Sequence, residues 1–152
     1  MATSSVRHVV QVATEQVRIP VARGRVERIV TAVLRAERVR NAEVSVTFVT
    51  NRRMAALNRR HLGHAGPTDV ISFGFAPVAT GLPVTGDIYI APAVARANAL
   101  AHGAGIREEL LRLVVHGTLH VVGHEHPTDA TRMTSPMWRR QERLLGRALR
   151  SA

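Results

Sequence analysis

The chain of 152 residues contains no cysteine and no lysine. Without cysteine it has neither a disulfide framework nor a thiolate metal site, and a reducing cytoplasm is the natural compartment. No stretch approaches the ~20 apolar residues that cross a bilayer, and residues 1–20 lack the continuous apolar run of a signal peptide. We therefore expect a cytoplasmic protein with no membrane partner.

Acidic residues are also scarce, since 11 carboxylates stand against 21 basic residues, all arginine, for a formal net charge of +10. Such a charge attracts polyanions, so nucleic acid is the leading partner class. Aromatic residues make up only 3% of the chain, which argues against a platform on which bases stack. The composition therefore favours contacts to phosphate over contacts to bases.

The length and a hydrophobic content of 45% fit one domain over residues 1–152. Alternating or β-branched segments predict four strands, at about residues 9–14, 43–50, 70–75 and 86–90. Helical spacing of apolar residues predicts five helices, at about 25–37, 52–62, 92–102, 107–122 and 135–149. We expect Asn51 to cap the second helix and the segment from Gly66 to Asp69 to break it. The fold class is α+β, a small mixed β-sheet packed with helices.

Four of the eight histidines fall inside the run HGTLHVVGHEH, from His116 to His126. His116 and His120 lie four residues apart, so a helix places them on one face, one turn apart. Gly123 can adopt the positive φ that ends a helix, and the returning chain then brings in His126. Three imidazoles suit one Zn²⁺ per chain, or another divalent metal, and leave a coordination position open as in catalytic sites.

Two residues inside this run have no assigned ligand position. His124 is an alternative third ligand, but it would need a tighter turn than His126, so we expect it to orient a ligand or face the substrate. Glu125 places a carboxylate beside the site, where it can orient a ligand or act as a general base. Both are candidate catalytic residues.

Three blocks of sequence resemble the YbeY family of metal-dependent endoribonucleases, also described as ribosomal RNA maturation factors. They are LNRRHLGHAGPTDVISFGF, TGDIYIAP and EELLRLVVHGTLHVVGHEH, in the family's order. The family's motif H-G-x-L-H-L-x-G-Y-D-H matches at His116, His120 and His126. The resemblance implies zinc at these ligands, cleavage of single-stranded RNA, and processing of ribosomal RNA with the small ribosomal subunit as partner; it implies no dinucleotide cofactor.

The chain departs from the family pattern at several positions. His124 and Glu125 stand where the family usually has Tyr and Asp. Upstream, Leu62 replaces an arginine that lines the family's cleft, and His61 and Gly66 replace the usual Tyr and Lys. We expect Arg59 or Arg60 to be the substitute guanidinium. The matching blocks also make His61, Thr68 and Ser72 candidate substrate contacts, with Asp69 in a structural role.

Two other functions fit part of the pattern. The spacing HxxxHxxGxxH is also that of metzincin metalloproteases, but Gly117 stands where the protease motif has its general-base Glu. The second alternative is a metal-stabilised ribosome-assembly factor that binds RNA without cleaving it.

Overall fold

The computed structural model describes residues 5–151. The elements follow in the order β1 (Arg7–Thr14), α1 (Arg23–Ala36), β2 (Asn41–Phe48), α2 (Asn51–Leu62), β3 (Val70–Phe75), β4 (Val84–Ile90), α3 (Pro92–Ala101), α4 (Ile106–Val121), η1 (Arg132–Thr134) and α5 (Pro136–Arg150). The strands form one mixed sheet in the order β1-β2-β4-β3. β1, β2 and β4 are parallel, and β3 runs antiparallel to β4. The predicted α+β class, with four strands and five α-helices, is confirmed over this part of the chain.

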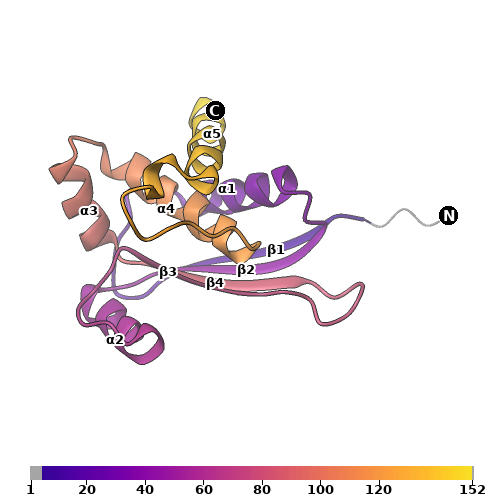
Figure 1. Ribbon diagram of the computed structural model, residues 1–152, viewed down its shortest axis with the longest axis horizontal. Helices are drawn as coiled ribbons and strands as arrows, with labels where there is room; N and C mark the ends of the chain where they lie inside the picture. Colours follow the sequence, from indigo (N-terminus) through magenta and orange to yellow (C-terminus); the bar gives the residue numbers. More distant parts are fainter. Residues whose placement is uncertain (1–4, 152) are drawn as a thin grey trace.

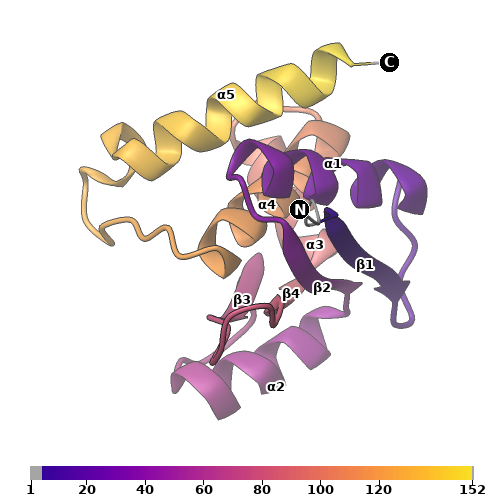
Figure 2. The same cartoon turned by 90° about the vertical axis from the view of Figure 1, so that its right-hand side faces the viewer.

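Helices cover the two faces of the sheet unequally (Figures 1 and 2). α1, α4 and α5 lie on one side, whereas α2 lies on the opposite side near one end. Buried and less buried residues alternate along β2. Its buried residues Val44, Val46 and Phe48 face the side with three helices and form one large core with residues of α1, α4 and α5. A smaller cluster under α2 includes Met54, Leu57 and Ile71, among others. None of the helices between residues 5 and 151 is both long and apolar enough to span a membrane.

Glycines bring α4 unusually close to the sheet. A Cβ atom at Gly117 would lie 2.7 Å from Cγ2 of Ile88 on β4, and one at Gly74 would lie 2.7 Å from the carbonyl oxygen of Val121. A Cβ at Gly86 would lie 2.4 Å from Cγ1 of Val121. The helix therefore rests directly on β3 and β4, and its last residue, Val121, lies over the paired glycines Gly74 and Gly86, close to the loop that joins the two strands.

The N-terminal cap of α2 differs from the one predicted. The N-cap is Thr50, whose hydroxyl accepts a hydrogen bond from the Arg53 amide at 3.1 Å, and Asn51 is already in the helix. The helix ends at Leu62, as predicted, because Gly63 adopts a left-handed conformation with φ of 69°. The prediction of Asn51 as the cap was wrong, because the hydroxyl of Thr50 already fills that role. The segment from Gly66 to Asp69 lies outside the helix, but Gly63 is the residue that terminates it.

Candidate metal centre

Three histidines converge at the C-terminal end of α4. His116 and His120 lie on the last turns of the helix, and Gly123, with φ of 107°, turns the chain so that His126 faces them. The ring centroids of His116 and His120 are 4.6 Å apart, and that of His126 lies 5.1 and 4.9 Å from these two. One nitrogen from each ring lies within 4.8 Å of the others, so the three could hold a metal ion.

The other ring nitrogen of each histidine is held by an oxygen. Nδ1 of His116 lies 2.6 Å from Oε1 of Gln141, that of His120 lies 2.8 Å from the carbonyl oxygen of His124, and that of His126 lies 2.8 Å from the carbonyl oxygen of Pro127. Amide and carbonyl oxygens only accept, so each Nδ1 carries the hydrogen and each Nε2 keeps its lone pair. The donor set therefore fits a divalent metal.

Burial favours the neutral form of two of these imidazoles, those of His116 and His120. Desolvation lowers the pKa of His116 to about 4, helped by the charges of His120, His126 and Arg132 and opposed by the hydrogen bond to Gln141. The pKa of His120 is also lowered, first by burial and then by His126. Neutral imidazole is the form that binds metal, so burial prepares His116 and His120 for an ion.

A polar network behind His116 extends into α5 and back to α4. Gln141, which is 1% exposed, donates from Nε2 to Oε2 of Glu142 at 3.0 Å, which fixes the orientation of its amide. Glu142 accepts from Nε of Arg112 at 3.0 Å, and Arg112 also pairs with Glu109 at 2.9 Å. The network fixes α5 against α4 and thereby holds the acceptor for the His116 ring.

His124 does not join the ligand group. Its Nε2 bonds Oε1 of Glu37 at the C-terminal end of α1, and Glu37 also pairs with Arg140 of α5 at 2.8 Å. Burial raises the pKa of Glu37, but the hydrogen bonds and charges of His124 and Arg140 outweigh it and leave this pKa lowered. His124 thus links the loop after α4 to α1 and, through Glu37, to α5. The carbonyl oxygen of the same residue orients the ring of His120.

A cleft of about 490 Å³ opens over the three histidines. Among its walls are Thr68, Ser72, His124 and Glu125, all of which are candidates from the sequence. Leu62 also lines it, whereas Arg59, Arg60 and His61 are exposed near the end of α2 and are not among the lining residues. The ring of His61 instead contacts that of Phe73 edge-on, with centroids 5.1 Å apart.

A second cavity of about 630 Å³ adjoins this cleft and shares Asp69, His116 and Arg132 with it. Asp69 accepts from the Val70 amide at 2.8 Å and from Nδ2 of Asn98 at 3.4 Å, contacts that agree with a structural role.

Sequence reasoning did not identify Gln141, Glu37 or Arg132, because each reaches the centre only through tertiary packing. Only Gln141 had a sequence signal, as a polar residue among the apolar positions of an otherwise basic helix.

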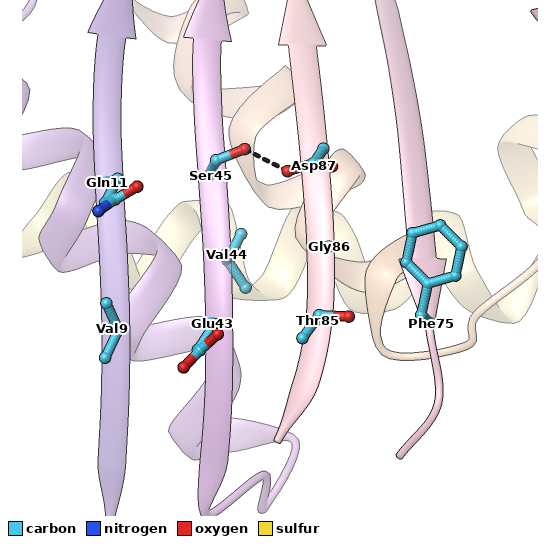
Figure 3. Close-up of a pocket in the computed structure, with 9 residues that line it drawn as sticks. All are labelled: Val9, Gln11, Glu43, Val44, Ser45, Phe75, Thr85, Gly86 and Asp87. Atoms are coloured by element: carbon cyan, nitrogen blue, oxygen red, sulfur yellow. Dashed lines mark hydrogen bonds between the residues drawn. The ribbon is translucent and has the colours of Figure 1, made fainter. Parts of the chain in front are cut away.

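A third depression, of about 380 Å³, lies on the sheet itself and away from the histidines (Figure 3). Glu43 and Ser45 of β2 alternate with the core residues Val44 and Val46, so they point to the face opposite α4. There the Ser45 hydroxyl donates to Oδ1 of Asp87 on β4 at 2.6 Å. This depression contains none of the candidate site residues.

The fold and the site define a class, that of small α+β proteins with a three-histidine centre at the end of a helix laid on a mixed sheet. Comparison with known proteins identifies the family. The family described as Endoribonuclease YbeY matches residues 10–148, and the chain belongs to that family. The predicted resemblance is therefore confirmed.

Individual relatives support the same family assignment. An Endoribonuclease YbeY from Geobacillus kaustophilus is 39% identical over 132 residues, which cover 80% of this chain and 83% of that protein. Another, from Micrococcus luteus, is 38% identical over 114 residues and covers 71% of each chain. A solution structure of a Thermotoga maritima protein superposes with a TM-score of 0.61 over 92% of this chain and 89% of its own, at 22% identity. This last likeness bears on the fold alone.

Proposed function

We propose that this chain is a metal-dependent endoribonuclease that cleaves single-stranded RNA during maturation of small-subunit ribosomal RNA. In this proposal residues 1–152 act as one hydrolase domain in the cytoplasm, with the small ribosomal subunit as partner and one Zn²⁺ per chain as cofactor. The observation that carries it is that all three histidines have Nδ1 bound to an oxygen, so that their Nε2 lone pairs are free for one ion. The membership of the YbeY family supports the reaction.

An ion at this position supplies Lewis-acid stabilisation of the charge on a phosphodiester. The residues of the chain provide the remaining requirements. His116, His120 and His126 hold the ion, and the carbonyl and amide oxygens behind them keep the rings in one orientation. The hydroxyls of Thr68 and Ser72 line the same cleft, where they can donate to oxygens of the RNA backbone.

Glu125 is the candidate general base. Within the part of the chain that the structure describes, two residues with carboxylates line the cleft, Asp69 and Glu125. Asp69 already accepts hydrogen bonds from Val70 and Asn98, whereas Glu125 has no such bond to any residue of the described chain. An exposed carboxylate beside the ligands is available to take a proton from the attacking group. His124, tied to Glu37, acts by holding the loop.

Arg59, Arg60 and His61 lie outside the cleft at the end of α2. In the proposed function they contact the RNA strand beyond the reacting phosphate, where cations position the strand without taking part in the reaction.

The structure of α4 argues against peptide hydrolysis. The residue after the first histidine is the general base in the protease motif. Here that residue is Gly117, and a Cβ atom on it would press against Ile88 of the sheet. Position 117 therefore faces the core, where a glutamate has no room and no access to a substrate.

The test is cleavage of a labelled single-stranded RNA by purified, metal-loaded protein, beside a duplex of the same sequence and a peptide substrate. We expect cleavage of the single strand, with activity lost in His116→Ala and His120→Ala. Equal cleavage by these variants would identify a contaminating nuclease and contradict the proposal. RNA binding without cleavage would favour the assembly-factor alternative, and peptide hydrolysis without RNA cleavage would favour the protease.

A further inference from the structure

Arg132 occupies a distinctive place beside the histidine centre. It is the first residue of η1, and together with Asp69 and His116 it lines both the metal cleft and the adjoining cavity. Among the described residues that line the cleft, it is the one arginine. Its side chain is exposed, and no hydrogen bond or ion pair joins its guanidinium to another residue between 5 and 151.

Arg132 lines the same cleft as His116, His120 and His126, so its charge faces the place where these residues would hold an ion. A cation in this position repels a divalent ion. An anion that lies between the two positive charges is attracted by both.

The other arginine of the adjoining cavity differs from Arg132. Arg112 pairs with Glu108 at 3.2 Å, Glu109 at 2.9 Å and Glu142 at 3.0 Å, and these hydrogen bonds and charges raise its pKa. These carboxylates occupy the guanidinium of Arg112 and neutralise its charge. It is therefore not available to bind a further anion. The free cation of the two connected cavities, within the described residues, is therefore Arg132.

We propose that Arg132 binds the phosphate of the RNA substrate that lies at the histidine centre, and is thus a catalytic residue. The inference rests on the proposed function and adds the group that contacts the anion. A guanidinium suits the task because its parallel N–H donors match two phosphate oxygens. Its position between the cleft and the second cavity lets it stay in contact with the strand as this passes from one to the other.

The experiment compares Arg132→Gln and Arg132→Lys with Arg139→Gln, an exposed arginine on α5 outside both cavities. Loss of a hydrogen bond to a charged group corresponds to a decrease in kcat/KM of about 10- to 100-fold for Arg132→Gln. Arg132→Lys should recover part of it, and Arg139→Gln should match the unmodified protein. Metal affinity, measured by chelator competition, should be equal or tighter in Arg132→Gln, because a repelling charge is removed.

Activity of Arg132→Gln within about twofold of the unmodified protein would overturn the proposal, as would a loss of metal affinity equal to its loss of activity. If the unmodified protein does not cleave RNA, the proposed function fails. The role of Arg132 in binding phosphate is then tested by RNA affinity instead of activity. Single-stranded RNA affinity is then measured against salt concentration. Arg132→Gln should lower the slope of log K against log salt by about one contact and Arg139→Gln should not; equal slopes in all three proteins would overturn it.

Discussion

Gln141 accepts the Nδ1 hydrogen of His116 at 2.6 Å, across 25 residues of sequence and between two helices. The amide is almost fully buried and its own Nε2 is bound to Glu142. It therefore cannot rotate to present a donor to the ring without breaking a second hydrogen bond. This contact fixes which nitrogen of His116 faces the cleft.

Replacing Gln141 should weaken metal binding. Gln141→Leu removes the acceptor and leaves the His116 ring free to rotate or change tautomer, so we expect zinc affinity to fall by about 10- to 100-fold. Chelator competition on the purified protein measures it. Arg139→Leu, an exposed position on the same helix, introduces the same side chain away from His116 and is the matched control, expected to bind zinc as the unmodified protein does. Equal affinity in all three proteins would show that the contact has no effect on the metal.

Gly117 should be sensitive to a single methyl group. Gly117→Ala places a Cβ atom 2.7 Å from Cγ2 of Ile88, and we expect the free energy of unfolding to fall by about 1–3 kcal/mol. Gly146→Ala in α5 is the control, since its Cβ would meet only the flexible end of Arg150 at 3.3 Å. It should be neutral or stabilise the helix by up to about 1 kcal/mol.

Urea unfolding of the metal-free proteins measures both glycine variants. In the background Ile88→Ala, which removes the clash, Gly117→Ala should cost less. An unchanged cost in that background would mean that the methyl group is not in contact with Ile88.

The metal-free protein should lose stability as the pH falls below about 6.5. The pKa of His116 is about 4 in the folded chain, so between these values the unfolded chain binds the proton and the folded chain does not. Stability therefore rises with pH across this window, by up to about 3 kcal/mol in total. Urea unfolding at several pH values measures it, with His116→Gln as control. An equal slope in that control would assign the effect to other groups.

Glu37 and His124 should act as a unit that holds the loop after α4. The side chain of Glu37 is only 12% exposed and serves both His124 and Arg140. Glu37→Gln leaves these partners with a weaker acceptor, and we expect a loss of about 1–3 kcal/mol in unfolding free energy. Because the pKa of Glu37 is lowered on folding, this contribution is present above the unfolded pKa and is lost as the pH falls through the folded one.

A double-mutant cycle of Glu37→Gln with His124→Gln isolates this pair. The two changes should couple by about 0.5–3 kcal/mol, because each removes the partner of the other. Strictly additive losses would indicate that the side chains do not interact in solution.

The sequence predicted most elements because their apolar residues follow clear periods. The alternation from Glu43 onward located β2 within two residues, and the spacing of His116, His120 and Gly123 gave the end of α4 and the histidine centre. Local competition between caps was less predictable, and so the cap of α2 was misassigned by one residue. The strand and helix periods were predictable because they depend on residues close in the chain, which a sequence shows directly.

The surroundings of the histidines could not be predicted in this way. Glu37 lies 87 residues from His124, and Gln141 reaches His116 only because α5 packs on α4. Arg132 lies in a stretch with no periodic pattern, between the ligand loop and α5. Such partners are determined by tertiary packing, and no spacing rule in a single sequence identifies them.

The most direct test of the account is a zinc titration of metal-free protein with single-stranded RNA cleavage as the signal. The three-histidine centre predicts that the rate rises linearly with added zinc and becomes constant at one ion per chain, and that His120→Ala shows no such rise. Cleavage that is already complete without metal, or that continues to rise well beyond one ion per chain, would contradict a single catalytic ion held by His116, His120 and His126.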